Sequence, residues 1–374
     1  LVVELNEPTP YFPGLLINAV TYPVPQHIIE KQGKDWTRPE NLIGNGAFKM
    51  REWKPQSRIV LEKSANYYGA QDVQLDKVIY YVSEDKNAEL QRYRAGELDW
   101  TADVPNDQIK WLRENLGAEL HIHNYLGTFY FGYNLTKPPF KDNPKLREAL
   151  TLAIDRDIIT DKVTGAGEKP AYSFVAPGIN GYDHYTPEYA SLDKAARIEK
   201  AKKLYEEAGY GKDKPLKVDL LYNTNENHKK IAVAVAAMWK QNLGVQTNLT
   251  NQEWKVFLTT RTEKKQTEAF RAGWIGDYND AYSFLELFQS KSGLNDSGYA
   301  SEKYDALLAQ AAQEQDMAKR AAILKEAEKM LTDDYPVAPI YSYVTKRLVK
   351  PYVKGYADEN VMDHRSSKYM WIEK

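Results

Sequence analysis

The sequence contains no cysteine, and this absence excludes several kinds of chemistry at once. Without thiol groups the chain has no cysteine nucleophile, no zinc–thiolate site, no iron–sulfur cluster and no disulfide. The chain has 374 residues. That length is enough for about two or three domains with sizeable cores, so the protein does not need disulfides for its stability.

An excess of charge of one sign is also missing. The 50 Lys and Arg residues nearly balance the 52 Asp and Glu residues, which leaves a formal net charge of −2. Because nucleic-acid-binding proteins usually carry a basic excess, we expect no nucleic-acid partner. No apolar run approaches the roughly 18 residues that cross a bilayer, so we expect no direct membrane span.

The motifs of common enzymes and metal sites are missing as well. The sequence lacks the G-x-S-x-G elbow, the H-E-x-x-H motif and the P-loop. Asp277, Asn279 and Asp280 resemble the start of a calcium-binding loop, but Tyr282 and Phe288 stand where that loop needs glycine and glutamate. We therefore expect no metal, no cofactor and no catalysis. A glycoside hydrolase with an aromatic cleft is the alternative from another class, because carboxylates and aromatic rings are plentiful, although no carboxylate pair stands out.

After about residue 127 the sequence alternates regularly between predicted strands and helices. Near-continuous apolar runs at 216–223 and 269–275 predict strands of a sheet that is covered on both faces. Amphipathic stretches predict helices at 193–208 and 226–243, the second of them closed by Gly244. This alternation favours a layered α/β fold. The chain before 127 and after about 345 has a strand-and-turn character, so we expect it to leave one lobe, build a second and return.

The stretch RAGWIGDYND at 271–280 has the features of a ligand-binding strand end. Gly273 and Gly276 lack side chains, so another backbone can approach them closely. Trp274 offers a flat apolar wall, and Asp277 follows the strand, where ligands of open α/β sheets bind. Asp277 could hold an ammonium group, although capping of a following helix is an alternative role for it. Three residues could supply positive charge for a carboxylate: Arg261, Arg271 and His228.

Four long stretches carry a specific likeness to a known family. They are YNTNENHKKIAVAVAAMWKQNLGV (222–245), NQEWKVFLTTR (251–261), FRAGWIGDYND (270–280) and APIYSYVTKRLVKPYVKGY (338–356). Together they resemble the periplasmic oligopeptide-binding proteins of ABC importers, and the likeness covers essentially the whole chain. It implies a type II receptor with two lobes on a hinge, which captures short peptides and delivers them to an ABC permease of the inner membrane. Such a receptor works as a monomer in the periplasm of a Gram-negative cell.

The resemblance also implies a role for each predicted site residue. Asp277 matches the family's aspartate for the α-ammonium group of the peptide. Arg261 and His228 match positions that receive the C-terminal carboxylate of peptides of different length. Backbone groups of Gly273 and Ile275 would pair with the main chain of an extended peptide, independently of its side chains. The remaining matches are positions in pocket walls: Arg271, Trp254, Trp274 and Tyr343.

The chain departs from the family's pattern at a few positions. Thr164 stands where some relatives carry a lysine that binds carboxylate, which bears on the preferred peptide length. Gly127 and Ile275 stand where some relatives have a cysteine pair. The stretches IGDYN (275–279) and GEKPAY (167–172) favour the murein-peptide-binding branch of the family. A sugar-binding receptor of similar architecture is a further alternative.

Members of the family have a substantial segment before the point where this match begins. The resemblance therefore implies three parts in this chain. We expect 1–26 to be a remnant of that N-terminal part. We expect 27–126 and 345–374 to form an incomplete lobe I, and 127–344 to form a complete ligand-binding lobe II.

Overall fold

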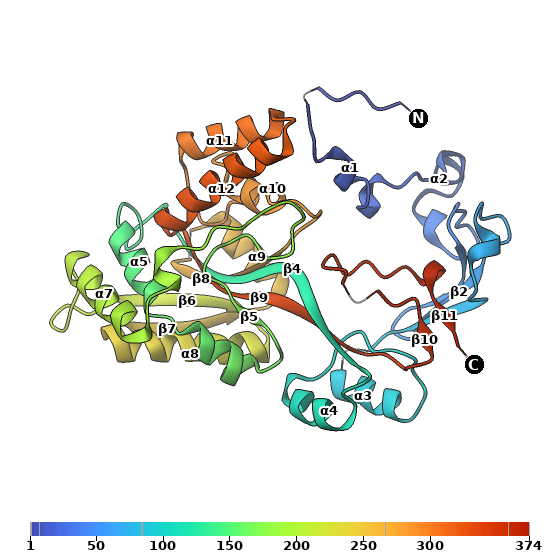
Figure 1. The fold of residues 1–374 in the computed structure, drawn as a ribbon, viewed down its shortest axis with the longest axis horizontal. Helices are drawn as coiled ribbons and strands as arrows, with labels where there is room; N and C mark the ends of the chain where they lie inside the picture. Colours follow the sequence, from blue (N-terminus) through green and yellow to red (C-terminus); the bar gives the residue numbers. More distant parts are fainter. Residues whose placement is uncertain (1, 7, 84, 266, 358, 374) are drawn as a thin grey trace. The chain divides into compact units, whose positions relative to one another are not determined.

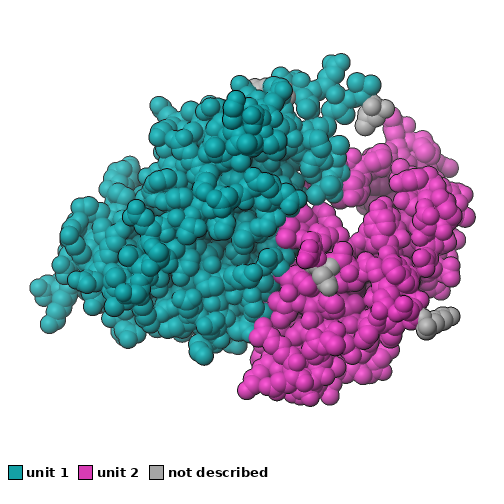
Figure 2. All heavy atoms as spheres, viewed as in Figure 1, with its two compact units in different colours: residues 1–17, 124–344 teal, residues 18–123, 345–374 magenta. Residues whose placement is uncertain are grey.

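The structure is a computed structural model that describes residues 2–6, 8–83, 85–265, 267–357 and 359–373. The chain divides into two compact units, which Figure 2 shows in different colours. Unit 1 comprises 1–17 and 124–344, and unit 2 comprises 18–123 and 345–374. The chain enters unit 1 within strand β4 (Leu120–Tyr133) and leaves it within strand β9 (Val337–Leu348). The units are thus connected by two continuous strands as well as by the early segment around residue 17.

Unit 1 is built on a six-stranded mixed sheet in the order β5-β9-β4-β8-β6-β7 (Figure 1). Strand β8 pairs antiparallel with β4, whereas β6 pairs parallel with both β7 and β8. Helices lie on both sides of this sheet, with α7 and α8 on one side and α11 and α12 on the other. The other strands of the sheet are β5 (Lys169–Pro170), β6 (Lys217–Asn223), β7 (Gln246–Gln252) and β8 (Ala269–Ile275). The helices are α1 (Phe12–Leu15), α5 (Pro144–Leu152), α6 (Arg156–Ile158), α7 (Lys194–Glu207), α8 (Glu226–Leu243), α9 (Trp254–Glu263), α10 (Tyr282–Leu285), α11 (Glu302–Gln313) and α12 (Met317–Asp334).

In the second half of strand β4, residues 126–133, side chains on both faces are buried. Phe129, Phe131 and Tyr133 are fully buried in a core that also contains residues of α5, α7 and α8. Thr128 lies on the other face, where its hydroxyl donates to the carbonyl oxygen of Phe174 at 2.9 Å. Apolar side chains on both faces explain the near-continuous apolar runs of the central strands, and they confirm the layered α/β fold.

Helix boundaries in unit 1 follow the capping chemistry of the sequence. The side chain of Asn143 accepts from the backbone N–H of Leu146, and a proline occupies the first turn of α5. Helix α8 begins after Asn225, whose side chain accepts from two backbone N–H groups of the first turn. It ends at Gly244, which adopts the left-handed conformation with φ 74°, as the sequence predicts.

The early segment of the chain packs within unit 1 through Tyr11. The Tyr11 ring stacks on Tyr278 and Tyr282, with ring centroids 5.5 and 4.9 Å away. The guanidinium group of Arg320 lies 5.1 Å from the centre of the same ring and makes a two-point ion pair with Asp280, at 2.7 and 3.0 Å. The residues expected to form a single remnant, 1–26, therefore fall into both units, since the boundary follows residue 17.

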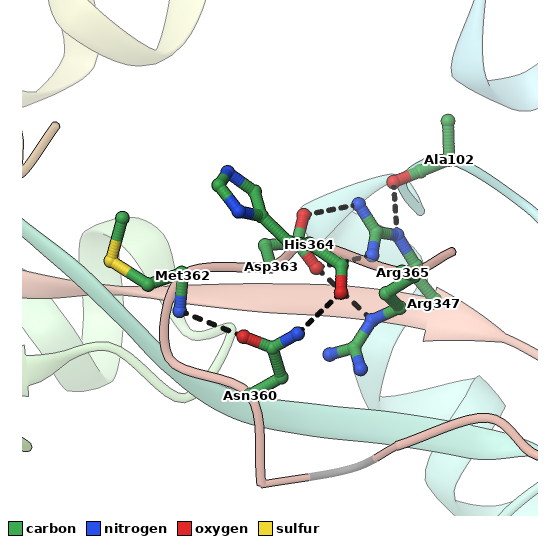
Figure 3. Close-up of polar contacts among 7 residues, drawn as sticks. All are labelled: Ala102, Arg347, Asn360, Met362, Asp363, His364 and Arg365. Carbon is green, nitrogen blue, oxygen red and sulfur yellow. Dashed lines mark hydrogen bonds and ion pairs between the residues drawn. The ribbon is translucent and has the colours of Figure 1, made fainter. Parts of the chain in front are cut away.

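Unit 2 contains a three-stranded antiparallel sheet in the order β1-β2-β3 and a two-stranded sheet of β10 and β11. Its C-terminal loop is attached to β9 by Arg347, which makes two hydrogen bonds to the carboxylate of Asp363 and one to the carbonyl oxygen of Ala102 (Figure 3). The strands are β1 (Phe48–Lys54), β2 (Arg58–Lys63), β3 (Lys77–Tyr81), β10 (Val353–Lys354) and β11 (Trp371–Ile372). The helices are α2 (Gln26–Gln32), α3 (Lys86–Arg94) and α4 (Ile109–Asn115).

Candidate ligand-binding site at the end of strand β8

Strand β8 has an open edge along its second half. Strand β6 pairs with β8 only at Leu220–Ala269 and Leu221–Phe270, while β8 continues to Ile275. On its other side β8 pairs with β4 over its whole length. Within the described part of unit 1, the backbone of 271–275 therefore has no strand partner on the β6 side. This is the end of the sheet where the carboxyl ends of the parallel strands β6, β7 and β8 meet, as expected for a ligand site.

The ladder between β4 and β8 determines which backbone groups point to the open edge. The N–H of Gly276 donates to the carbonyl oxygen of Leu126 at 2.8 Å, so the facing residues Gly127 and Ile275 form a non-hydrogen-bonded pair. Pairs of this kind recur at every second residue of an antiparallel ladder. The N–H and C=O groups that point away from β4, toward the open edge, are those of Arg271, Gly273 and Ile275.

A buried guanidinium group lies at one end of this edge. Arg271 donates from Nη2 to the Tyr343 hydroxyl at 2.9 Å and from Nη1 to Asn223 Oδ1 at 3.5 Å. Its guanidinium carbon lies 4.8 Å from the centre of the Phe129 ring. Arg271 has no carboxylate partner among the described residues, and its Nε is buried without a hydrogen bond. A buried, uncompensated cation with a spare donor is suited to an anionic group of a ligand.

His228 lies beside this cluster, in surroundings that favour the neutral imidazole over the cation. Its Nδ1 lies 2.9 Å from Asn223 Oδ1. Burial, and then the nearby charge of Arg271, lower the pKa of His228 to about 3. The imidazole can therefore still exchange hydrogen bonds at neutral pH, but the positive charge of the cluster is that of Arg271.

Arg261 is also less available than predicted, because its charge is compensated within the protein. Its Nε lies 2.5 Å from Asp296 Oδ2, and both side chains are largely buried. Burial raises the pKa of Asp296 despite this ion pair. Both Arg261 and Trp254 contact the Phe257 ring, at 5.3 and 5.9 Å, and the Trp254 side chain is about half exposed on helix α9. These two residues thus form a separate group on α9.

Gly273 allows the Arg271–Tyr343 contact to form beneath the open edge. A Cβ atom at position 273 would lie 2.5 Å from the Tyr343 hydroxyl and 3.2 Å from Arg271 Nη2. Both distances are shorter than ordinary contacts. The glycine is therefore required by packing as well as by the approach of another backbone, which was the only reason that the sequence suggested.

Trp274 and Asp277 form a second group, held by Ser283. The indole N–H of Trp274 donates to the Ser283 carbonyl oxygen at 2.7 Å, and the backbone N–H of Asp277 donates to the Ser283 hydroxyl at 2.9 Å. Trp274 alternates with Arg271 and Gly273 along β8, so it faces the opposite side of the sheet. The predicted residues of β8 and Asp277 therefore lie at one strand end, but not on one face.

The Asp277 carboxylate is exposed and has no partner among the described residues. It does not cap a helix, since α10 begins after Ala281 and the first-turn N–H of Tyr282 is bound by Asp280. Partial burial raises the pKa of the Asp277 carboxyl group. Burial, and then the charge of Asp277, raise the pKa of Glu286 to about 7. The raised pKa values mean that the two carboxylate charges are unfavourable here, so a cation beside Asp277 would stabilise them.

Three residues that organise the site were not predicted from the sequence: Asn223, Phe129 and Ser283. Asn223 stands at the carboxyl end of β6, so its position after an apolar strand was the one available signal.

No group of three or more His, Asp or Glu residues that could hold a metal ion occurs in the described chain. Across the same residues, no helix combines the length and the apolar character that crossing a membrane requires.

The open edge of β8 and the charged groups beside it are suited to binding a ligand, and comparison with known proteins identifies the class. Residues 1–296 match the family model of bacterial extracellular solute-binding proteins, family 5. The chain belongs to this family.

Two similar proteins, one of them compared both as a sequence and as a solved structure, place it more closely within the family. The periplasmic oligopeptide-binding protein OppA of Escherichia coli is 41% identical over 375 residues, covering 100% of this chain and 69% of that protein. The periplasmic murein peptide-binding protein MppA of the same organism is 40% identical over 377 residues, with coverage of 100% and 69%. The solved structure of the Escherichia coli murein tripeptide binding protein MppA superposes with a TM-score of 0.87 at 39% identity, covering 99% of this chain and 72% of that one. These matches confirm the predicted family and the type II two-lobed fold.

Proposed function

We propose that this protein is an extracytoplasmic receptor that captures short peptides and delivers them to an ABC import permease. The observation that carries the proposal is the open edge of β8, where the backbone groups of Arg271, Gly273 and Ile275 point away from β4. An extended peptide would add to this edge as a further strand, which gives affinity that does not depend on its side chains. The names of the relatives, which bind oligopeptides and murein peptides, support the same ligand class.

Charge at the two ends of the edge would set the direction of the peptide. The exposed Asp277 carboxylate lies just beyond Ile275 and would bind the α-ammonium group. The uncompensated Arg271, with His228 as a neutral hydrogen-bonding neighbour, would bind the C-terminal carboxylate. From 271 to 275 the strand rises about 13 Å, which is the length of a peptide of about three to five residues. Trp274, Trp254 and Tyr343 would line side-chain pockets, and Arg261 would contribute through nitrogens that Asp296 leaves free.

We further propose that unit 1 acts as the ligand-binding lobe, that the protein is a monomer in the periplasm of a Gram-negative cell, and that it has no catalytic activity. Membership of a family of solute-binding proteins supports the absence of catalytic activity. Incubation with a panel of glycans would test it directly, because detectable hydrolysis would favour a carbohydrate-active enzyme.

The ammonium site can be tested by calorimetric titration with tri-alanine and with N-acetyl tri-alanine. We expect Asp277→Asn to weaken tri-alanine binding by about 10- to 100-fold, because a hydrogen bond to a charged group is lost. Asp213→Asn removes another exposed carboxylate of unit 1 and should change nothing. Acetylation removes the ammonium charge, so the acetylated peptide should bind wild type and Asp277→Asn equally weakly. Unchanged tri-alanine affinity in Asp277→Asn would disprove the assignment.

The murein-peptide branch is the narrower alternative within the same family. The identities to OppA and MppA are 41% and 40%, so both ligand classes have the same support. Titration with the murein tripeptide and with tri-lysine separates them. Preference for the murein tripeptide would assign the branch, and equal or tighter binding of tri-lysine would assign a general oligopeptide receptor.

A further inference from the structure

Unit 1 contains a cavity whose described lining residues all lie outside the β8 edge. The cavity has a volume of about 340 Å³, and its lining falls in 155–162 and 190–197, together with Tyr172. These stretches include α6 and the start of α7. At about 30 Å³ for each water molecule of the liquid, the cavity has room for on the order of ten water-sized groups. This is enough space for a small molecule such as an amino acid.

One wall of the cavity is formed by a buried guanidinium group. Arg197 lies near the start of α7, is only 4% exposed, and has an Nε that is buried without a hydrogen-bond partner. Its guanidinium carbon lies 6.0 Å from the centre of the Tyr172 ring. The guanidinium carbon of Arg156, which donates only to backbone carbonyl oxygens, lies 5.0 Å from the same centre. Among the described residues, neither arginine has a carboxylate at ion-pair distance, so an anionic group in the cavity would be stabilised.

Two of the carboxylates that line the cavity already have other partners. The buried Asp155 pairs with Lys194 Nζ at 2.7 Å and accepts from the backbone N–H of Ile158 at 3.1 Å. Asp193 caps α7 by accepting from the backbone N–H of Ala196 at 2.8 Å. The donors of the buried arginine in the cavity wall therefore remain available to a ligand.

The exposed side of the cavity carries free negative charge. Asp157 and Asp161 line the cavity four residues apart, and within the described chain no hydrogen bond or ion pair engages their carboxylates. Over all described lining residues, four aspartates face three basic residues, of which Lys162 and Lys194 are exposed. A simple anion would be repelled by this excess, whereas a ligand that also carries a cation would find a partner for each of its charges.

We propose that this cavity binds a small zwitterion of the amino-acid class, in which an apolar chain separates a carboxylate from an ammonium group. The carboxylate binds Arg197, the apolar chain lies against the Tyr172 ring, and the ammonium group binds Asp157 and Asp161. The cavity shares no described lining residue with the β8 edge. It is therefore a second binding site, which does not depend on the proposed peptide site.

Calorimetric titration with ε-aminocaproate, caproate and n-hexylamine tests both charges, because the last two compounds each lack one of them. We expect ε-aminocaproate to bind at least about tenfold more tightly than either of them. The double variant Asp157→Asn, Asp161→Asn should weaken ε-aminocaproate binding by about tenfold without weakening caproate binding. The matched control Asp213→Asn, Glu206→Gln removes two exposed carboxylates elsewhere in unit 1 and should change nothing. Arg197→Gln should abolish ε-aminocaproate binding, because the carboxylate loses its partner.

A further titration separates this cavity from the peptide site. Protein saturated with tri-alanine, and the variant Asp277→Asn, should both bind ε-aminocaproate as wild type does. Competition between tri-alanine and ε-aminocaproate would place the zwitterion at the β8 edge and overturn the proposal. Equal binding of caproate and ε-aminocaproate, or unchanged affinity in the double variant, would also overturn it, whether or not Arg197→Gln folds. If tri-alanine did not bind at all, the proposed function would fail, and the first set of titrations would still decide the zwitterion site.

Discussion

Substitution of Gly273 by alanine tests whether the Arg271–Tyr343 contact organises the candidate site. The new Cβ atom would lie 2.5 Å from the Tyr343 hydroxyl and 3.2 Å from Arg271 Nη2. Neither neighbour can move freely, because the partly buried Tyr343 packs against Phe129 and Arg271 also donates to Asn223. The substitution should therefore separate the tyrosine from the arginine rather than be accommodated.

The size of the effect follows from two contributions. Overpacking a well-filled interior costs about 1–3 kcal/mol. Loss of a hydrogen bond to a charged group costs about 1.5–3 kcal/mol. We expect Gly273→Ala to lower the free energy of unfolding by about 2–5 kcal/mol, since the two contributions partly overlap. Tyr343→Phe alone loses only the hydrogen bond and should cost about 1.5–3 kcal/mol.

The double variant makes the prediction specific. Tyr343→Phe removes the atom that lies 2.5 Å from the new Cβ and leaves the ring carbon Cζ at 3.4 Å, an ordinary contact. Adding Gly273→Ala to Tyr343→Phe should therefore cost little, so the two effects should be non-additive by about 1 kcal/mol or more. Gly211 has open space around its Cβ position, so Gly211→Ala is the matched control and should stay within about 0.5 kcal/mol of wild type.

Urea denaturation followed by tryptophan fluorescence gives these free energies, and calorimetric titration with tri-alanine gives the accompanying affinities. Gly273→Ala should weaken peptide binding, because its Cβ projects where the guanidinium group of Arg271 is positioned. The argument would be refuted if Gly273→Ala behaved like Gly211→Ala, or if the effects of the two substitutions in the double variant were simply additive.

Two further predictions concern charge in unit 1. Asp280→Asn should destabilise the protein by about 3–5 kcal/mol in the same urea denaturation, because it leaves the buried Arg320 without its counter-ion. Asp183→Asn breaks only an exposed pair with Lys325 and should leave the free energy of unfolding nearly unchanged. The folded-state pKa of His228 is about 3, below its ordinary value of 6.5, so the unfolded state binds more protons between these values. The contribution of His228 to stability should be complete above pH 6.5 and should decrease as pH falls toward 3. In thermal denaturation across this range, the melting temperature of His228→Gln should depend less steeply on pH than that of wild type. An equal dependence on pH in the two proteins would contradict this prediction.

The elements of unit 1 could be predicted closely from local patterns. The predicted helix 226–243 and strand 269–275 agree with α8 and β8 residue for residue. Asn225 and Gly244 mark the ends of α8 because capping chemistry acts over a few residues and is therefore visible in the sequence. Strand β4, by contrast, starts at Leu120, before the alternation that the sequence shows after about residue 127, since its early residues are only partly buried and do not form an apolar run.

The residue types of the site could also be predicted from the sequence, but their ion pairing and protonation could not. Asp277 was correctly placed just after a strand, at the carboxyl end of the sheet. The sequence suggested that Arg261 and His228 carry available positive charge. In the structure Asp296 pairs with Arg261, and burial beside Arg271 lowers the pKa of His228. Both effects depend on neighbours that are distant in the sequence.

By itself, the sequence determined the family, the α/β layering and the strand end that carries Gly273, Trp274 and Asp277, because these depend on local periodicity and on long motifs. Only the tertiary structure decided that β6 leaves β8 after Phe270, which opens the backbone edge of 271–275. It also decided that, among the described residues, Arg261 has a carboxylate partner and Arg271 has none. Strand pairing and ion pairs depend on contacts between residues that are distant in the sequence, so they cannot be predicted from local patterns.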